Sequence, residues 1–111
     1  MVVSSGSDDF TDRVERLLSS IDAAFDRLGD DHDVDVERAG TVLTITFESG
    51  RRMVVNSQEA NHEVWLAAKS GGFHYRWDDV RETWDDTRGG PDLKTRLSSL
   101  VEEETGTPLV L

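Results

Sequence analysis

The stretch that decides the fold is Thr41-Val42-Leu43-Thr44-Ile45-Thr46-Phe47-Glu48-Ser49-Gly50, followed directly by Arg51–Asn56. Side chains alternate along it with a period of two, because Leu43, Ile45 and Phe47 occupy every second position. Met53 and Val55 continue the alternation after a turn at Ser49-Gly50. Such alternation is typical of strands with one buried and one wet face, and the short turn predicts an antiparallel hairpin.

Further strands are predicted on both sides of this hairpin. Upstream, acids alternate with Val34 and Val36 over residues 33–37, and Ala39-Gly40 turns the chain into the hairpin. Downstream, the pattern predicts strands over Glu63–Ala68, over Phe73–Trp77 after a turn at Gly71-Gly72, and over Thr83–Asp85.

A helix is predicted at each end of the run of strands. The first covers residues 8–28, with Ser7 as its N-cap and Gly29 as its stop, because apolar residues recur every three or four positions: Phe10, Val14, Leu17, Leu18, Ile21, Phe25 and Leu28. The second opens at Gly89-Gly90-Pro91, with Pro91 near its first position. It carries the stripe Leu93, Leu97, Leu100 and Val101, and Gly106 ends it.

This order of elements predicts an α+β fold, a two-layer sandwich in which both terminal helices pack on one antiparallel sheet. Residues 7–111 are expected to form a single domain. Residues 1–6 are expected to be a disordered tail, and the apolar end Leu109-Val110-Leu111 is expected to tuck against the core.

Composition excludes several classes of protein. The 111 residues carry a formal charge of −11, which argues against a nucleic-acid binder. With no cysteine there is no disulfide, thiolate metal site or cysteine nucleophile. No apolar run is long enough to cross a membrane, and no signal peptide is visible, so a soluble cytoplasmic protein is expected.

The negative charge is concentrated in residues 8–37, where eleven acids face three arginines. Glu15, Asp22 and Asp26 share one helix face by their spacing, with Asp30 just beyond the helix, and Asp33, Asp35 and Glu37 share one strand face. The two rows are expected to merge into one acidic ridge. A solvated helix face beside a charge-guarded edge strand is the plainer alternative for any single carboxylate.

Oxygen ligands of this kind select hard cations such as Mg²⁺, Mn²⁺ and the iron ions. Because these carboxylates are exposed, binding is expected to be weak, multi-site and open to competition among divalent cations. No calcium-loop pattern, phosphate loop or catalytic triad signature accompanies them, so an enzyme is not expected.

Trp65 is expected to face outward, because Val64, Leu66 and Ala68 occupy the inward positions of its strand. It is either an exposed anchor for a protein partner or covered by neighbours such as His62 or the stems of Arg51 and Arg52. Trp77 and Trp84 are expected in core or semi-core positions, and His74 on the surface.

Several motifs together resemble the frataxin family, in particular its bacterial CyaY branch. They are the acidic first helix, Val42–Gly50, Asn56-Ser57-Gln58-Glu59, and Val64-Trp65-Leu66-Ala67-Ala68-Lys69-Ser70-Gly71-Gly72-Phe73-His74-Tyr75. The resemblance runs from about Phe10 to the end of the second helix and is weakest between Asp78 and Leu93.

The resemblance implies an iron-binding protein of iron–sulfur cluster biogenesis that holds Fe²⁺ and Fe³⁺ weakly on its surface. It implies docking on the cysteine desulfurase and scaffold machinery, as an iron-dependent regulator and iron donor, in a monomer that metal can drive to oligomers. By position, the metal ridge comprises Asp22, Asp26, Asp31, Asp33, Asp35 and Glu37, to which spacing adds Asp30. Partner contacts fall on Asp22, Asp26, Asp33, Asn56, Gln58 and Trp65.

Some positions depart from the family pattern. Ala23, Arg27 and Gly29 stand where bacterial relatives often carry acids, Ala60 replaces a usual proline, and Glu63 replaces a common glutamine beside the tryptophan. Other functions remain open: a metal-independent acidic inhibitor that docks on a basic enzyme surface, a ferroxidase, and an iron-storage particle.

Overall fold

The computed structural model describes residues 6–29 and 32–111, with side chains described from residue 9 onward. The tail expected to be disordered covered residues 1–6. Residues 1–5, with Asp30 and Asp31, lie outside the described residues, whereas Gly6 is already helical.

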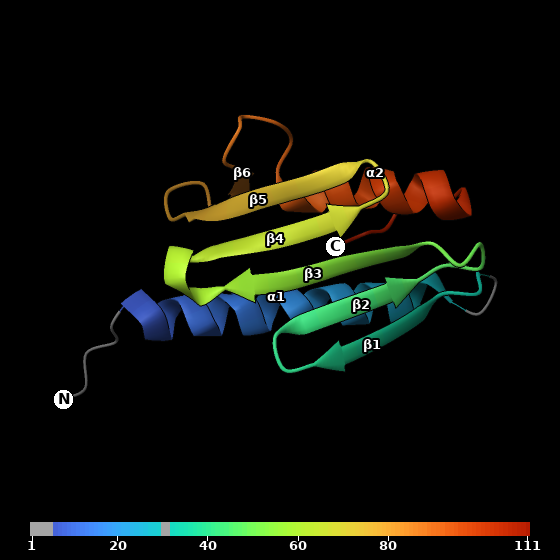
Figure 1. The fold of residues 1–111 in the computed structure, drawn as a ribbon, viewed down its shortest axis with the longest axis horizontal. Helices are drawn as coiled ribbons and strands as arrows, with labels where there is room; N and C mark the ends of the chain where they lie inside the picture. Colours follow the sequence, from blue (N-terminus) through green and yellow to red (C-terminus); the bar gives the residue numbers. More distant parts are fainter. Residues whose placement is uncertain (1–5, 30–31) are drawn as a thin grey trace.

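One helix precedes and one helix follows a meander of six strands in the chain (Figure 1). Helix α1 spans Gly6–Leu28 and helix α2 spans Leu93–Thr105. The strands follow one another across a single antiparallel sheet in chain order: β1 (Asp35–Ala39), β2 (Val42–Thr46), β3 (Arg52–Gln58), β4 (Glu63–Ala68), β5 (Gly71–Asp78) and β6 (Thr83–Asp86). A short 3₁₀ turn, Glu59–Asn61, joins β3 to β4. The predicted α+β sandwich is confirmed.

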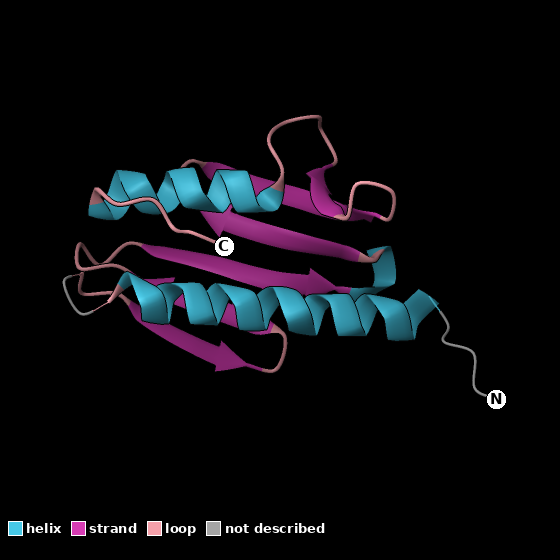
Figure 2. Ribbon diagram, turned by 180° about the vertical axis from the view of Figure 1, so that it is seen from behind, coloured by secondary structure: helices cyan, strands magenta, loops and turns pink. Residues whose placement is uncertain are grey.

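Both helices lie on the same face of the sheet, so the opposite face is left without a covering layer (Figure 2). The alternation read from the sequence places the aliphatic residues toward the helices. Leu43, Ile45, Met53, Val55 and Leu66 are each at most 3% exposed.

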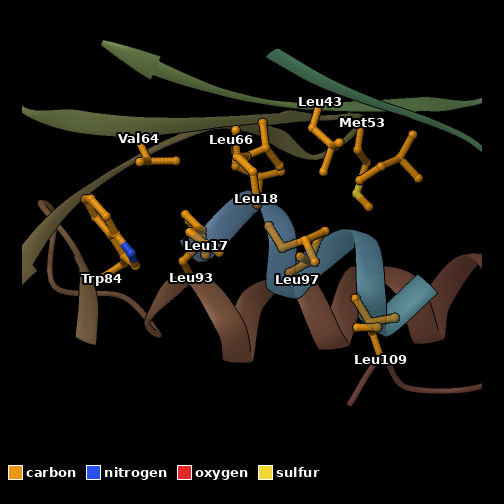
Figure 3. Close-up of a cluster of buried hydrophobic side chains, with 14 of the residues drawn as sticks. Leu17, Leu18, Leu43, Met53, Val64, Leu66, Trp84, Leu93, Leu97 and Leu109 are labelled. Carbon is orange, nitrogen blue, oxygen red and sulfur yellow. The ribbon is translucent and has the colours of Figure 1, made fainter. Parts of the chain in front are cut away.

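The core fills the space between the two layers (Figure 3). Leu17 and Leu18 of α1 and Leu93 and Leu97 of α2 meet the inward side chains of the sheet, and Trp84 closes one end of the cluster. Trp84 is buried and Trp77 packs against it, as expected for core and semi-core positions.

Element boundaries required four corrections. Helix α1 begins at Gly6, so Ser7 lies inside the helix and is not its N-cap. Asp92 caps α2 by accepting a hydrogen bond from the Thr95 N–H at 2.9 Å, which leaves Pro91 before the helix. The tight turn between β4 and β5 is at Lys69-Ser70, because Gly71 and Gly72 already pair in the sheet. Strand β1 begins at Asp35, so Asp33 lies in the preceding loop.

The segment after α2 returns between the two helices (Figure 2). Leu109 is buried and Leu111 packs against the core, whereas Val110 is 73% exposed, so the predicted packing holds for two of these three residues. The Arg27 side chain donates a hydrogen bond to the Val110 carbonyl oxygen at 3.1 Å and so ties the segment to α1. Neither described helix has the length and apolar character needed to cross a membrane.

Candidate functional site: the acidic ridge and the outer sheet face

The helix row of the ridge lies on the flank of α1 that faces the edge strand β1. Asp22 and Asp26 are exposed and share this flank with Glu15, seven and eleven residues before them. The Arg38 side chain, on the inward face of β1, forms an ion pair with Glu15. This contact ties the acidic flank of the helix to the edge of the sheet.

The strand row runs alongside the helix row. Helix α1 and strand β1 are antiparallel, and the Glu15–Arg38 pair sets their alignment (Figure 1). Seven helical residues and three strand residues both advance about 10 Å, so Asp22 lies level with Asp35. By the same measure Asp26 lies level with Asp33. This spacing places the two rows side by side along the β1 edge, and their merging into one acidic ridge stays a prediction.

The side chains of the two rows point in different directions from the β1 edge. Val36 and Val34 pack toward the core, so Asp35 and Glu37 point to the outer face of the sheet, while Asp22 and Asp26 belong to the helix layer. The ridge thus wraps around the edge strand instead of forming one flat strip. Of its six described carboxylates, Glu15 pairs with Arg38, and the other five are not paired with an arginine or lysine of the described chain: Asp22, Asp26, Asp33, Asp35 and Glu37.

The described residues contain no cluster of three His, Asp or Glu side chains arranged to enclose a metal ion. Asp30 and Asp31, which fall between the two rows in the sequence, lie outside the described residues. The described carboxylates provide a row of exposed oxygen ligands along the β1 edge of the sheet. Such a row suits hard cations held by one or two carboxylates plus water.

A second cluster occupies the outer face of the sheet around Trp65. The indole ring is half-buried and stacks on the His74 imidazole, with ring centroids 4.2 Å apart and planes inclined by 8°. The Trp65 Nε1–H donates a hydrogen bond to Glu63 Oε1 at 2.9 Å. Trp65 therefore faces outward as expected, with one ring face covered by His74.

Glu63 is the buried anchor of this cluster, at 6% exposure. Its other oxygen accepts a hydrogen bond from Arg76 at 2.7 Å, and His74 Nδ1 lies 3.8 Å from Oε1. The hydrogen bond from Trp65, together with Arg76, holds the pKa of Glu63 below its usual value despite the opposing effect of burial. Glu63 thus stays ionised and fixes the indole in one orientation.

Asn56 and Gln58 complete the outer-sheet patch. In the register of β3 and β4, Asn56 lies opposite Trp65 and Gln58 lies opposite Glu63. Cross-strand neighbours have Cβ atoms about 5 Å apart, so both amides flank the indole. The structure brings together the three predicted members of this patch, Asn56, Gln58 and Trp65.

The sequence placed Glu63 beside Trp65 and His74 on the surface, but it missed that His74 covers the indole and that Arg76 binds Glu63. His62, one of the neighbours named as a cover for Trp65, does not cover it. His62 stacks on Phe10 at 5.1 Å instead. A signal was present: with the turn placed at Lys69-Ser70, antiparallel pairing sets Trp65 opposite His74 and Glu63 opposite Arg76. The predicted turn at Gly71-Gly72 lies two residues later. It leaves each side chain on the correct face of the sheet but puts other residues opposite Trp65 and Glu63.

Comparisons with known proteins agree with this architecture. The family model described as a frataxin-like domain matches residues 4–107. The iron-sulfur cluster assembly protein CyaY of Bordetella petrii is 47% identical over 105 residues, which cover 93% of this chain and 94% of that protein. The protein of the same name from Albidiferax ferrireducens is 41% identical over 105 residues, with the same two coverages.

Solved structures give the same result. A frataxin from Psychromonas ingrahamii, of the CyaY family, superposes with a TM-score of 0.84 at 27% identity, covering 95% of this chain and 96% of that one. A trimeric frataxin from the yeast Saccharomyces cerevisiae, complexed with ferrous iron, superposes with a TM-score of 0.61 at 27% identity, covering 96% and 91%. The chain belongs to the frataxin family, in its bacterial CyaY branch.

Proposed function

We propose that this protein binds iron on the acidic ridge and serves iron–sulfur cluster assembly as an iron-dependent regulator and iron donor. Its partners are the cysteine desulfurase and the scaffold on which clusters are built. The observation that carries the proposal is the row of exposed carboxylates along the β1 edge, of which only Glu15 pairs with an arginine or lysine in the described chain. The names of the CyaY relatives and the ferrous complex of yeast frataxin support it.

The physical basis is electrostatic. Like charges at helix and strand spacing repel, at about a few tenths of a kcal/mol for each neighbouring pair. A bound cation removes this repulsion, and so does a basic partner surface. Iron and partner therefore use the same carboxylates, so occupation by one changes the affinity for the other. Binding of either one weakens as salt concentration rises.

Trp65 adds a second, largely apolar contact. Its indole is held by Glu63 and His74, so little conformational entropy is lost when a partner covers it. A held aromatic residue on an otherwise polar face is a common centre of a protein interface. We propose that Trp65, Asn56 and Gln58 contact the assembly machinery while the ridge steers the approach.

The protein itself is proposed to have no catalytic centre, and to act in the cytoplasm. A carboxyl group that serves as a general acid near neutral pH needs a raised pKa. Glu63 and Asp78 are instead shifted down, Glu63 first by its hydrogen bond from Trp65 and Asp78 first by the backbone N–H of Arg81.

The test is reconstituted cluster assembly with the desulfurase and scaffold across an iron series, using wild-type protein and Asp22→Asn/Asp26→Asn/Asp33→Asn/Asp35→Asn. The variant is expected to lose iron binding and most of its effect on the assembly rate. A matched control removes four exposed acids elsewhere: Glu48→Gln, Glu59→Gln, Glu102→Gln and Glu103→Gln. Equal behaviour of the two variants would show that total charge, and not the ridge, is responsible.

A metal-independent inhibitor is the second candidate, favoured by the absence of an enclosing three-ligand cluster among the described residues. It predicts the same inhibition of the desulfurase with and without iron, whereas the first proposal predicts an effect that grows with iron. A ferroxidase would instead speed oxygen consumption above the rate of free Fe²⁺, which is not expected.

A further inference from the structure

A pocket of about 310 Å³ opens on the helix side of the molecule, on the flank of α1 away from the acidic row. Its walls come from α1, the end of β5, β6 and the start of α2. The C-terminal segment enters the space between the helices further along α2, where Leu109 and Leu111 lie against Ser98 and Ser99. The volume is at the lower end of the range of small-molecule sites.

The floor of the pocket is aromatic and apolar. Trp84 and Leu17 are 4% exposed, and Trp77 meets the Trp84 ring edge-on at a centroid distance of 5.5 Å. Because Trp84 and Leu17 are buried and the two indole planes are inclined by 65°, the surface open to a ring is the exposed part of Trp77, with Trp84 and Leu17 as the apolar base beneath it. The hydroxyls of Ser20 and Thr83 add polar atoms to the walls.

The rim of the pocket carries positive charge, although the chain as a whole carries −11. Arg13, Arg16 and Lys94 all line it, against the two acids Glu82 and Asp92. Asp92 is already engaged as the cap of α2. In the described chain neither Arg16 nor Lys94 takes part in an ion pair.

Helix α1 thus separates its charges by face. The acidic row points to the β1 edge, and Arg13 and Arg16 point to the opposite flank, toward α2. The helix period makes this separation a property of the sequence, but only packing against Trp77, Trp84 and Lys94 turns the basic flank into a concave site.

One carboxylate that does not itself line the pocket already binds two side chains that do, Arg13 and Trp77. Asp79 Oδ1 accepts hydrogen bonds from Arg13 at 3.2 Å and from Trp77 Nε1 at 3.1 Å, and the Arg13 guanidinium lies 5.4 Å from the Trp77 ring centroid. An arginine and an indole N–H that converge on one oxygen form a carboxylate-binding pair. Because the Asp79 side chain is 81% exposed, its hold on this pair is weak.

We propose that this pocket binds a small aromatic carboxylate, with the ring against Trp77, above the buried Trp84, and the carboxylate toward Arg13, Arg16 and Lys94. Asp79 is a built-in competitor for the same donors. The ligand bridges α1, α2 and the end of the sheet, so its binding stabilises the fold. This site is independent of the acidic ridge and of the Trp65 patch.

The test uses 2-naphthoate as the probe and follows the indole N–H signals of Trp77 and Trp84 by two-dimensional NMR of the full chain. Both signals are expected to shift and saturate, while the Trp65 signal stays in place. The neutral analogue 2-naphthalenemethanol is expected to bind at least about five-fold more weakly than 2-naphthoate. Inorganic phosphate alone is expected to cause no saturable shift, since it lacks the ring.

Two variants change the affinity in opposite directions. Arg16→Gln/Lys94→Gln should weaken 2-naphthoate binding about five-fold, the size expected for two exposed cations. Its matched control is Arg52→Gln/Lys69→Gln, which removes one exposed arginine and one exposed lysine on the far side and should leave binding unchanged. Asp79→Asn should tighten binding by freeing Arg13, whereas Glu48→Gln, which removes an acid elsewhere, should not.

The proposal is overturned if neither tryptophan signal saturates, if the neutral analogue binds as tightly, or if the two double variants weaken binding equally. It is also overturned if Asp79→Asn leaves the affinity unchanged. Because Asp79→Asn predicts a gain, a loss of binding through misfolding cannot imitate it.

Discussion

Trp65 lies face to face with His74 across the β4–β5 pair, and both rings stand beside the buried carboxylate of Glu63. The arrangement makes the single outward tryptophan of the sheet a rigid feature. Glu63, which stands where the family commonly has glutamine, is matched here by Arg76 directly opposite in the register. Charge and countercharge therefore hold the patch in one conformation.

Glu63→Gln should lower the free energy of unfolding at pH 7 by about 1–2 kcal/mol, because it removes a charged hydrogen-bond partner of Arg76 in a buried position. The pKa of Glu63 in the folded chain is below its usual value of 4.5, so its ionic contribution to stability is present above pH 4.5 and is lost as pH falls through the folded pKa. Urea unfolding should therefore show the difference between variant and wild type narrowing below pH 4.5. Exposed Glu59→Gln should show no such narrowing.

Divalent cations should stabilise the fold by relieving repulsion on the ridge. At millimolar Mn²⁺ the melting temperature is expected to rise by about 2–5 °C, since weak sites contribute about a kcal/mol at these concentrations. Asp22→Asn/Asp26→Asn/Asp33→Asn/Asp35→Asn should melt higher than wild type without metal and respond little to it. Calorimetry with NaCl at matched ionic strength separates binding from screening, and an equal rise with NaCl would contradict ridge binding.

The single tyrosine offers a direct spectroscopic check of the core. Burial raises the pKa of Tyr75 to about 12, so its absorbance near 295 nm should change around that pH in the folded protein and near pH 10 in urea. Since the folded pKa lies above the unfolded one, stability from this group is complete below pH 10 and falls as pH rises toward 12. Titration near pH 10 in both conditions would show that Tyr75 is accessible.

Tyr75→Phe tests what burial of the Tyr75 hydroxyl costs in free energy of unfolding. The Tyr75 hydroxyl is buried and has no hydrogen-bond partner among the described residues. Removing it should leave the unfolding free energy unchanged or raise it by up to about 1 kcal/mol, because an unpaired buried hydroxyl is costly. A clear loss of stability in urea unfolding would instead reveal a partner for this hydroxyl.

Asp92→Ala should destabilise the protein by about 1 kcal/mol, the usual contribution of a helix cap. The carboxylate accepts the Thr95 N–H at the start of α2, and Ala supplies no acceptor. Asp92→Asn, which keeps the acceptor, is the control and should retain most of the stability in the same unfolding experiment.

Much of the fold was predictable because its signals are local. The period of two in Val42–Thr46 and Arg52–Gln58 and the period near 3.6 in α1 arise from backbone geometry alone. Boundaries were less predictable, since Ser7 is a good cap and Pro91 a good first helical residue, yet the chain begins α1 at Gly6 and caps α2 with Asp92. Competing local solutions of similar free energy are decided by packing.

In the candidate site, too, local features were predictable and features set by packing were not. Spacing was enough to assign Asp22 and Asp26 to one helix face and Asp35 and Glu37 to one strand face. It could not show that Arg38 would take Glu15 and so align the two rows, nor that the rows would point to different layers. Those outcomes depend on contacts between residues far apart in the chain.

By itself, the amino-acid order determined the class of fold, the faces of its helices and strands, and the concentration of negative charge, because periodicity and composition are local properties. The tertiary structure alone decided which side chains became neighbours: His74 over Trp65, Arg76 on Glu63, and Arg13 beside Trp77. These pairings rest on strand register and helix packing, which are set by the burial of the whole core at once.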